Sequence, residues 1–377
     1  MNIEDIALTM VHGLGVKGVV HLLECFGSAE HVFAQPLETL VERAELREDV
    51  ARNIVSHSSF AEAEREMDYC RRHNITPIAS TDADYPQIMR ETDDYPHVIY
   101  VCGSVGALAK RTIAFVGTRR MTPYGELACS RLVGGLAERL PDLCIVSGLA
   151  YGIDAAAHRA AIAAGAATVA VVANPLPGVT PTAHADLARD IIDHGGAIIS
   201  ELPSNTKQNG SFFISRNRIM AALGYGTVVV ESDSSGGSLV TARMADGYNR
   251  SVMAVPGRIT DRFSSGTNML IRNRKAQAVL SADDIISELM WELELPTEPA
   301  PEADAEADRA LLESLLPDER RILEAFGNAD TLSGAELAAR CAMNFGELSA
   351  HLMSMEIAGL VRQLPGNMFE KLLNITI

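Results

Sequence analysis

Thr112-Ile-Ala-Phe-Val-Gly117-Thr118-Arg119-Arg120 is the stretch that decides the fold, because its apolar run ends in a glycine and two arginines. A second island runs from Leu143 to His158, and in it Leu-Cys-Ile-Val leads into Ser147-Gly148-Leu-Ala-Tyr151-Gly152-Ile-Asp154. A short apolar run followed by a helix-like pattern is typical of a buried parallel strand that feeds a helix. Such a junction points backbone N–H groups above the sheet and suits phosphate. The neighbouring arginines make it a candidate anion site.

The same rhythm continues along the chain and predicts an α/β fold. Helical patterns such as 125–140 and 155–164 separate apolar runs at 112–116, 143–147, 167–172, 197–200, 227–231 and 252–255. This alternation predicts an extended Rossmann-like, mostly parallel sheet with helices on both faces. A further strand is expected at 97–102. Ligands of such folds lie beyond the carboxyl ends of the strands, where both islands fall.

Smaller domains are predicted on both sides of this sheet domain, which we place at 79–292. Residues 1–78 are expected to form a helical domain of the helix-hairpin-helix or SAM-like type around Gly13-Leu14-Gly15. Such a turn can present N–H groups to a DNA phosphate. Because Lys17 is the basic residue near it and the segment is acidic, protein docking and direct DNA contact both remain open.

The C-terminal part changes in composition. Residues 293–312 are an acidic Pro/Ala linker with nothing to bury. Residues 313–377 show three amphipathic helices and then a strand, turn and strand, which predicts a winged-helix-like domain. Its candidate recognition helix is poor in Lys and Arg, so protein contact and nucleic-acid contact remain alternatives.

Charge and cysteine content limit the class of protein. The 377 residues carry a formal net charge of −17, but the acidic excess lies in the flanks, whereas residues 105–285 are slightly basic. This distribution permits a nucleic-acid partner without proving one. The six cysteines show no Cys-x-x-Cys spacing, no signal-peptide pattern is seen, and no apolar run approaches the ~20 residues of a membrane helix. We therefore expect a cytoplasmic protein without a metal site or a membrane partner.

A third island, Ser215-Arg216-Asn217-Arg218-Ile219, follows the aromatic pair Phe212-Phe213. Two guanidinium groups beside an amide, at the start of a helical pattern, suit phosphate or base-edge contacts, and a ring can stack a base. The alternative is that one of the two arginines, first Arg218 and then Arg216, forms an ion pair with an interior carboxylate such as Glu231 and holds the sheet together. Gly236-Gly237-Ser238 predicts another loop that can cradle an anion.

Catalytic signals are weak. The dinucleotide fingerprint and the Lys-Ser/Thr of a P-loop are missing. Gly148 and Gly152 allow close backbone approach, and Asp154 is expected to cap the helix that follows. For His158 a buried structural role is preferred to a catalytic one. Since no nucleophile–base set, carboxylate pair or metal-ligand cluster has a recognisable spacing, we expect a binding protein without a cofactor.

Together these motifs resemble the DprA/Smf family of bacterial DNA-processing proteins. The resemblance covers essentially the whole chain and is strongest over 112–273, where Gly195-Gly-Ala-Ile-Ile-Ser-Glu201, Gly237-Ser-Leu-Val-Thr-Ala242 and Val255-Pro-Gly257 complete the family's order. It implies a non-enzymatic protein whose Rossmann-like domain binds single-stranded DNA and forms a homodimer. It also implies loading of RecA onto incoming strands during transformation.

The resemblance implies that Arg119 and Arg216 are the leading phosphate contacts. The other residues of the implied site shape its pocket: Gly117, Ser147, Gly148, Tyr151, Gly152, Asn217, Arg218, Gly237 and Ser238. This sequence departs from the family pattern at 174–184, at 272–276 and at Tyr151, where many relatives carry Lys or Arg. A ring at position 151 can stack a base in place of the lost charge.

Two other classes remain as alternatives. A phosphoribohydrolase-like, nucleotide-processing enzyme would share this kind of sheet, but Ser235-Gly-Gly-Ser238 does not match that family's Pro-Gly-Gly-x-Gly-Thr run. Nucleotide turnover would favour it. A scaffold that contacts recombination proteins through its acidic flanks, without binding DNA, is the other class, and DNA binding by an isolated 80–290 fragment would weaken it.

Overall fold

The computed structural model describes residues 1–291, 315–327, 331–357, 360–364 and 368–371. Contacts divide the chain into two compact units, Met1–Glu294 and Leu295–Ile377. The predicted linker at 293–312 lies outside the described residues. Within the described residues, no helix is both long enough and apolar enough to span a bilayer.

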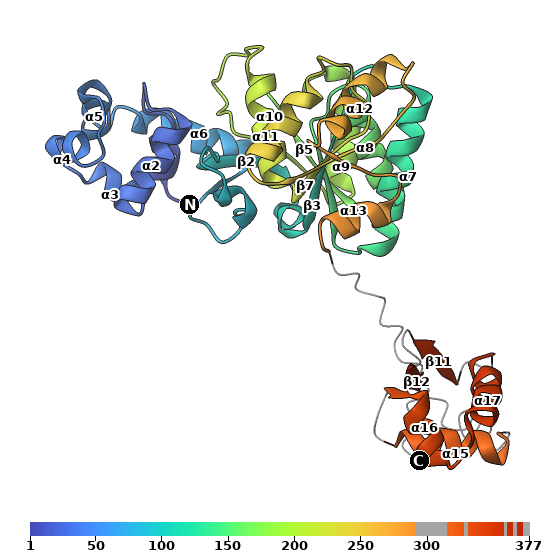
Figure 1. Cartoon of the computed structure of the whole chain (residues 1–377). Helices are drawn as coiled ribbons and strands as arrows, with labels where there is room; N and C mark the ends of the chain where they lie inside the picture. The colour runs from blue at the N-terminus through green and yellow to red at the C-terminus, as the bar shows by residue number, and fades with distance from the viewer. Residues whose placement is uncertain (292–314, 328–330, 358–359, 365–367, 372–377) are drawn as a thin grey trace. The chain divides into compact units, whose positions relative to one another are not determined.

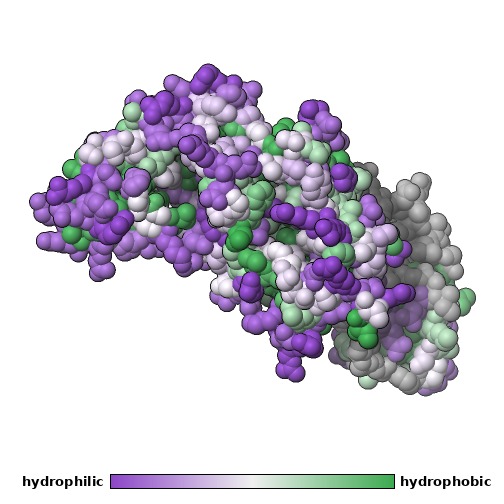
Figure 2. All heavy atoms as spheres, turned by 90° about the horizontal axis from the view of Figure 1, so that it is seen from above, coloured by the Kyte–Doolittle hydropathy of each residue, from purple (hydrophilic) through white to green (hydrophobic). Residues whose placement is uncertain are grey.

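The first unit begins with a helical region (Figure 1). This region has its own apolar core, in which Ile6, Leu22 and Leu40 are fully buried. Gly13 adopts a φ of +84° in the turn between the first two helices, so the predicted helix, Gly-x-Gly turn and helix are present. Hydrophilic side chains cover most of this region in the view of Figure 2. Within residues 1–75 the helices are α1 Ile3–Thr9, α2 Val16–Phe26, α3 Ala29–Phe33, α4 Leu37–Glu42, α5 Glu48–Val55 and α6 Phe60–Arg72.

A mostly parallel sheet follows, as predicted. In the described part of the unit its strand order is β1-β2-β6-β5-β4-β3-β7-β8-β9. The pairs from β6 to β9 are parallel, whereas β2 pairs antiparallel with both β1 and β6. The edge strands β1 and β9 were not predicted. The strands are β1 Thr76–Ala79, β2 Val98–Gly103, β3 Arg111–Val116, β4 Leu143–Ser147, β5 Ala167–Val171, β6 Ala197–Ser200, β7 Gly226–Val229, β8 Ser251–Ala254 and β9 Gln277–Ala278.

Helices cover both faces of the sheet (Figure 1). Alternate side chains of β3 face opposite layers: Ile113 and Phe115 pack beneath one group of helices, and Ala114 and Val116 beneath the other. The first group is α7 Pro123–Arg139, α8 Ile153–Ala163, α9 Ala185–Asp193 and α13 Ala282–Glu288. The second group is α10 Phe212–Leu223, α11 Ser238–Gly247 and α12 Ser265–Arg272.

Buried polar contacts join the helical region to the sheet. His97, which precedes β2, has its Nε2 3.1 Å from Asp5 of α1 and its Nδ1 2.8 Å from the hydroxyl of Ser80. Lys17, beside the Gly-x-Gly turn, forms an ion pair of 2.5 Å with Asp93. The cation that the sequence places at the turn is therefore engaged by a carboxylate of the same chain.

The second unit has the predicted winged-helix arrangement. Its described helices pack around Phe326, Leu337 and Leu352, and Phe369 of the last strand joins the same core. The sheet has the order β10-β12-β11 with antiparallel pairs. The described elements are α15 Pro317–Phe326, β10 Thr331–Ser333, α16 Gly334–Cys341, α17 Phe345–Ile357, β11 Val361–Leu364 and β12 Met368–Lys371.

His158 of α8 is buried against β5 in the neutral form. Its Nδ1 lies 2.7 Å from the hydroxyl of Thr168, which donates to the Ile145 carbonyl at 2.8 Å. Because the Thr168 hydroxyl uses its hydrogen for this bond, it accepts one from Nδ1. Nδ1 therefore carries the hydrogen of the neutral ring, and Nε2 carries none. Burial, reinforced by the charge of Arg216, lowers the pKa of His158 to about 3. This environment supports the structural role rather than the catalytic one.

We expect the first unit to lose stability as the pH falls through the range below about 6.5. In this range His158 binds a proton in the unfolded chain but not in the folded one. Each pH unit therefore lowers the free energy of unfolding by about 1.4 kcal/mol until the folded pKa of about 3 is reached. Urea unfolding followed by the fluorescence of Trp291, the single tryptophan, measures this change. Between about pH 6.5 and 5, the free energy of unfolding of His158→Gln should fall by about 2 kcal/mol less than that of the wild type. Equal losses would contradict the buried neutral ring.

Candidate nucleic-acid interface

The winding direction of the sheet reverses between β3 and β7. From β3 the chain proceeds outward through β4 and β5 to β6, and from β7 it proceeds the other way through β8 to β9. The connections that leave these two neighbouring strands therefore turn to opposite faces. Open parallel sheets bind their ligands in the resulting crevice, beyond the carboxyl ends of the strands.

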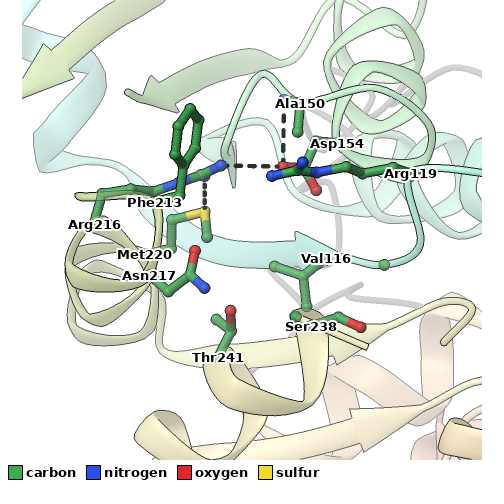
Figure 3. A pocket seen from close by; sticks show the side chains of 12 residues that line it. Val116, Arg119, Ala150, Asp154, Phe213, Arg216, Asn217, Met220, Ser238 and Thr241 are labelled. Carbon is green, nitrogen blue, oxygen red and sulfur yellow. Dashed lines mark hydrogen bonds and ion pairs between the residues drawn. The ribbon is translucent and has the colours of Figure 1, made fainter. Parts of the chain in front are cut away.

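A small pocket opens at this reversal point (Figure 3). Its volume is about 70 Å³, which is space for a few water molecules. It can therefore admit one phosphate-sized group but not a whole nucleotide. The lining residues come from both sides of the reversal and are Val116, Gly117, Arg119, Ala150, Asp154, Phe213, Arg216, Asn217, Met220, Gly237, Ser238 and Thr241.

Arg216, in the second turn of α10, brings a buried guanidinium to the pocket. Its side chain is 6% exposed and lies 3.7 Å from Asp154, and one Nη atom is 2.9 Å from the sulfur of Met220. Within the described chain its Nε has no hydrogen-bond partner. Burial lowers the pKa of Arg216, but an arginine stays protonated in proteins. Because an unpaired buried donor is costly, an anionic oxygen at this point would relieve that cost.

The backbone after β4 makes room for this guanidinium. A Cβ on Gly148 would lie 1.3 Å from an Nη atom of Arg216, so a larger residue cannot share the space. Gly152, at φ +78°, lets the Thr118 carbonyl approach within 2.1 Å of where its Cβ would be. The hydroxyl of Ser147 donates to the Phe115 carbonyl at 2.6 Å. These residues of the second island therefore shape the back of the pocket.

Arg119 is the exposed cation of the pocket, and its loop is fixed on both sides. The backbone N–H of Thr118 donates to the Glu231 carbonyl at 2.8 Å, and that of Thr122 donates to the Glu231 carboxylate at 2.9 Å. The guanidinium of Arg119 lies 5.7 Å from the ring centroid of Phe213 in a cation–π contact. Figure 3 shows Arg119 and Arg216 pointing toward each other, with Asp154 close to both.

The start of α11 forms the opposite wall. Gly237 is the N-cap of this helix and has no side chain to bond its first N–H groups. Ser238 donates its hydroxyl hydrogen to the hydroxyl of Ser232 at 2.9 Å, which holds the first turn in place. The backbone N–H groups of Leu239 and Val240 donate to the Gly236 and Gly237 carbonyls at 3.1 and 3.0 Å. A helix N-terminus still carries a partial positive charge, so this wall favours a negative ligand.

Asp154 sets the electrostatic balance of the pocket. The sequence predicted a helix cap, but the N-cap of α8 is Gly152, and no capping bond from a side chain is present in the described structure. Asp154 lies in the first turn of α8, accepts the N–H of Ala150 at 3.4 Å and faces Arg216. Burial raises the pKa of Asp154, and the charge of Arg216 opposes this shift. An ionised Asp154 repels an anion, so protonation of Asp154 favours anion binding.

The predicted site residues fall into three groups: those that line the pocket, those behind it, and Tyr151 beside it. Tyr151 lies next to the pocket residue Ala150 and is 51% exposed, with its ring edge-on to His184 at a centroid distance of 4.9 Å. His184, from the unusual 174–184 segment, is tied by its Nδ1 to the Leu149 carbonyl at 2.7 Å. Ser147, Gly148 and Gly152 lie behind the pocket, as described above. The predicted residues that line it are Gly117, Arg119, Arg216, Asn217, Gly237 and Ser238.

Arg218 lies outside the pocket lining and forms a nearly buried ion pair with Glu201, which follows β6. Glu231, the partner that the sequence suggested, accepts hydrogen bonds from Thr122 instead. The reason is that α10 begins at Phe212, so both arginines lie within the helix rather than at its predicted start. Positions 216 and 218 are therefore about 200° apart around a continuous helix and face opposite sides.

Sequence reasoning did not place Val116, Ala150, Met220 or Thr241 in the pocket. Met220 follows Arg216 by four residues in α10, and Thr241 follows Ser238 by three in α11. Residues at these spacings lie on one helix face, so correct helix starts would have found both. Among the described residues, no group of three or more His, Cys, Asp or Glu side chains is arranged to hold a metal ion.

Comparison with known proteins relates both units to one family. Residues 76–290 match the family described as DNA recombination-mediator protein A, and residues 296–367 match the DprA winged helix domain. The chain is 31% identical to the putative DNA processing protein DprA of Mycobacterium tuberculosis, over 90% of this chain and 86% of that protein. It is 34% identical to the protein Smf of Escherichia coli, over 78% and 76%.

Solved structures show the same relationship. The X-ray structure of DprA from Streptococcus pneumoniae has a TM-score of 0.67 and 28% identity, and the match covers 76% of this chain and 98% of that one. DprA from Helicobacter pylori, whose structure is described for its single-stranded DNA binding mode, has a TM-score of 0.52 and 26% identity, over 58% and 96%.

Gly148→Ala should destabilise the first unit by about 1–3 kcal/mol, because the new methyl group forces the buried guanidinium of Arg216 to move. Gly237→Ala is the matched control, since no described atom lies within 4 Å of its added Cβ. It should change stability by no more than about 0.5 kcal/mol. Urea unfolding followed by Trp291 fluorescence compares the two. Equal stabilities would show that the backbone at residue 148 does not constrain Arg216.

Sulfate binding to the pocket should strengthen as the pH falls below neutral, because burial raises the pKa of Asp154 and so lets it take up a proton at a higher pH than an exposed carboxyl group does. Asp154→Asn should bind sulfate about fivefold more tightly at neutral pH and lose this part of the pH dependence. Calorimetric titration with sulfate, whose charge is constant in this range, measures both effects. A variant that binds more weakly, with an unchanged pH profile, would contradict the opposing role of Asp154.

Proposed function

The chain belongs to the DNA recombination-mediator protein A family, the DprA/Smf proteins, and on this basis we propose that it binds single-stranded DNA at the pocket between β3 and β7. One observation carries the proposal: Arg216 is a buried cation whose Nε has no partner within the described chain, in a pocket of about 70 Å³. A backbone phosphate matches that volume and charge. The similarity to the Helicobacter pylori protein, which binds single-stranded DNA, supports the ligand class.

Phosphate contacts and base stacking would share the binding energy. A phosphate at Arg216 meets the N-terminus of α11, while Arg119 is exposed for a further contact. The half-exposed ring of Tyr151 and the partly buried ring of Phe213 offer stacking surfaces to bases that a duplex keeps paired. Every base has a stacking face and every nucleotide a phosphate. Binding should therefore show little sequence preference and fall steeply with salt.

We further propose that the protein is a mediator without catalytic activity. Both carboxylates around the pocket already have partners, since Asp154 faces Arg216 and Glu231 accepts two hydrogen bonds from Thr122. In this proposal a homodimer formed through the sheet domain protects incoming strands and delivers them to RecA during transformation. The family's description as a recombination mediator supports this role. A cytoplasmic setting is consistent with the cysteines, all six of which lie in the described ranges and are free.

Arg119→Ala should weaken binding of a labelled oligothymidine about 5- to 20-fold and reduce the slope of log K against log salt by about 0.7, because one phosphate contact is lost. Fluorescence anisotropy at several salt concentrations measures both quantities. The wild type should bind the single strand more tightly than the matching duplex, because only the single strand can place bases on the exposed rings.

Arg131→Ala is the control for this experiment. Arg131 is an exposed residue of α7 with no hydrogen bond or ion pair in the described structure, so its removal changes the net charge by the same amount. We expect its effect to be less than about twofold. Equal losses for both variants would mean that general charge, and not the pocket, drives binding. No binding by the wild type at low salt would refute the proposed ligand.

A further inference from the structure

A contact from the helical region holds the loop that leads into α10. Glu66 of α6 is 4% exposed. Its carboxylate accepts the backbone N–H of Ser204 at 2.9 and 3.0 Å and the Ser204 hydroxyl at 2.5 Å. One helical turn earlier, Glu62 accepts a hydrogen bond from the side chain of Asn205. Hydrogen bonds to a charged acceptor are about twice as strong as neutral ones, so Glu66 is a firm anchor.

This loop spans residues 201–211, between β6 and α10. Its start is fixed by the ion pair between Glu201 and Arg218. Beyond the Glu66 anchor, the side chain of Gln208 donates to the hydroxyl of Thr180 at 3.3 Å, an exposed and longer contact. The chain then enters α10 through a turn in which the N–H of Phe212 donates to the Asn209 carbonyl at 3.1 Å.

The beginning of α10 depends on this incoming chain. Its N-cap, Ser211, makes no capping bond through its side chain in the described structure. The first two turns of the helix nevertheless carry Phe213, Arg216 and Asn217, all of which line the pocket. The backbone N–H of Ser211 donates instead to the side chain of Asn209 at 3.0 Å, so the helix start takes its position from the residues before it. The Glu66–Ser204 contact is the buried anchor in the first half of those residues.

From this arrangement we propose that Glu66 is a positioning residue for the pocket, so that α6 of the helical region controls DNA affinity through Ser204. The inference rests on the proposed binding of single-stranded DNA. A loop that is ordered before binding does not have to be ordered by the ligand, so an intact anchor preserves affinity. The helical region thereby acts on the bound strand without touching it, a role distinct from both docking a protein and contacting DNA.

The sign of one mutational effect separates this role from simple electrostatics. Removing a carboxylate makes the chain less negative, which by itself strengthens DNA binding. We expect the reverse for Glu66→Ala, which should weaken oligothymidine binding about three- to tenfold with an unchanged salt slope, because no phosphate contact is lost. Glu64→Ala is the matched control, since Glu64 is an exposed residue of the same helix without a hydrogen bond or ion pair in the described structure. It should leave affinity unchanged or slightly raised.

Hydrogen–deuterium exchange of the DNA-free, full-length chain provides a second readout. Amides of residues 204–213 should exchange faster in Glu66→Ala than in the wild type and in Glu64→Ala. Glu66→Gln keeps one acceptor oxygen and should give intermediate exchange and affinity, and it serves as the test variant if Glu66→Ala folds poorly. Binding stoichiometry is recorded for each variant, because loss of folded protein lowers the stoichiometry without changing Kd.

The outcomes distinguish the two proposals. If the wild type binds DNA and Glu66→Ala matches Glu64→Ala in both affinity and exchange, the positioning role is overturned while the proposed function stands. Weaker binding by Glu66→Ala, with faster exchange confined to residues 204–213, supports the positioning role. If the wild type binds no single strand at low salt, the proposed function fails, and control of DNA affinity by Glu66 fails with it.

Discussion

Burying the guanidinium of Arg216 places two demands on the chain at once, and the architecture of the site follows from them. Space is needed, and Gly148 supplies it because any Cβ there would overlap the guanidinium. A compensating charge is needed, and Asp154 supplies it at 3.7 Å. That separation is longer than a direct hydrogen bond, so the pair neutralises charge while Nε has no hydrogen-bond partner in the described structure. A tighter ion pair would stabilise the ligand-free protein, so an anion would gain less free energy on binding.

The fold brings distant segments to this guanidinium. The reversal of winding between β3 and β7 sets the ends of these strands side by side, so that Gly117 and the start of α11 face α10 across one crevice. Buried carboxylates then fix the parts around it: Glu231 holds the loop of Arg119 through Thr122, and Glu201 holds α10 through Arg218. Glu231 and Glu201 therefore serve as supports for a loop and a cation near the pocket.

Much of the fold could be predicted because its signals are local. Continuous apolar runs mark buried parallel strands, and all of those predicted between 112 and 255 are strands of the sheet. The strands β1 and β9 were missed because they are short and carry little apolar pattern. The strand order that creates the crevice is not encoded in periodicity, and neither is the start of α10. Without a capping signal at Ser211, the sequence could not tell which of Arg216 and Arg218 faces the pocket. The role of Asp154 was hidden for a similar reason, since its partner is 62 residues away in the chain.

The most direct test of a phosphate site at Arg216 is a crystal structure of the protein with a short oligothymidine strand. We expect one phosphate of the strand in the pocket between β3 and β7, with an oxygen about 3 Å from Nε of Arg216 and the same phosphate facing the N-terminus of α11. A strand bound elsewhere on the molecule, with the pocket free of phosphate and the pairing of Arg216 with Asp154 unchanged, would contradict this site.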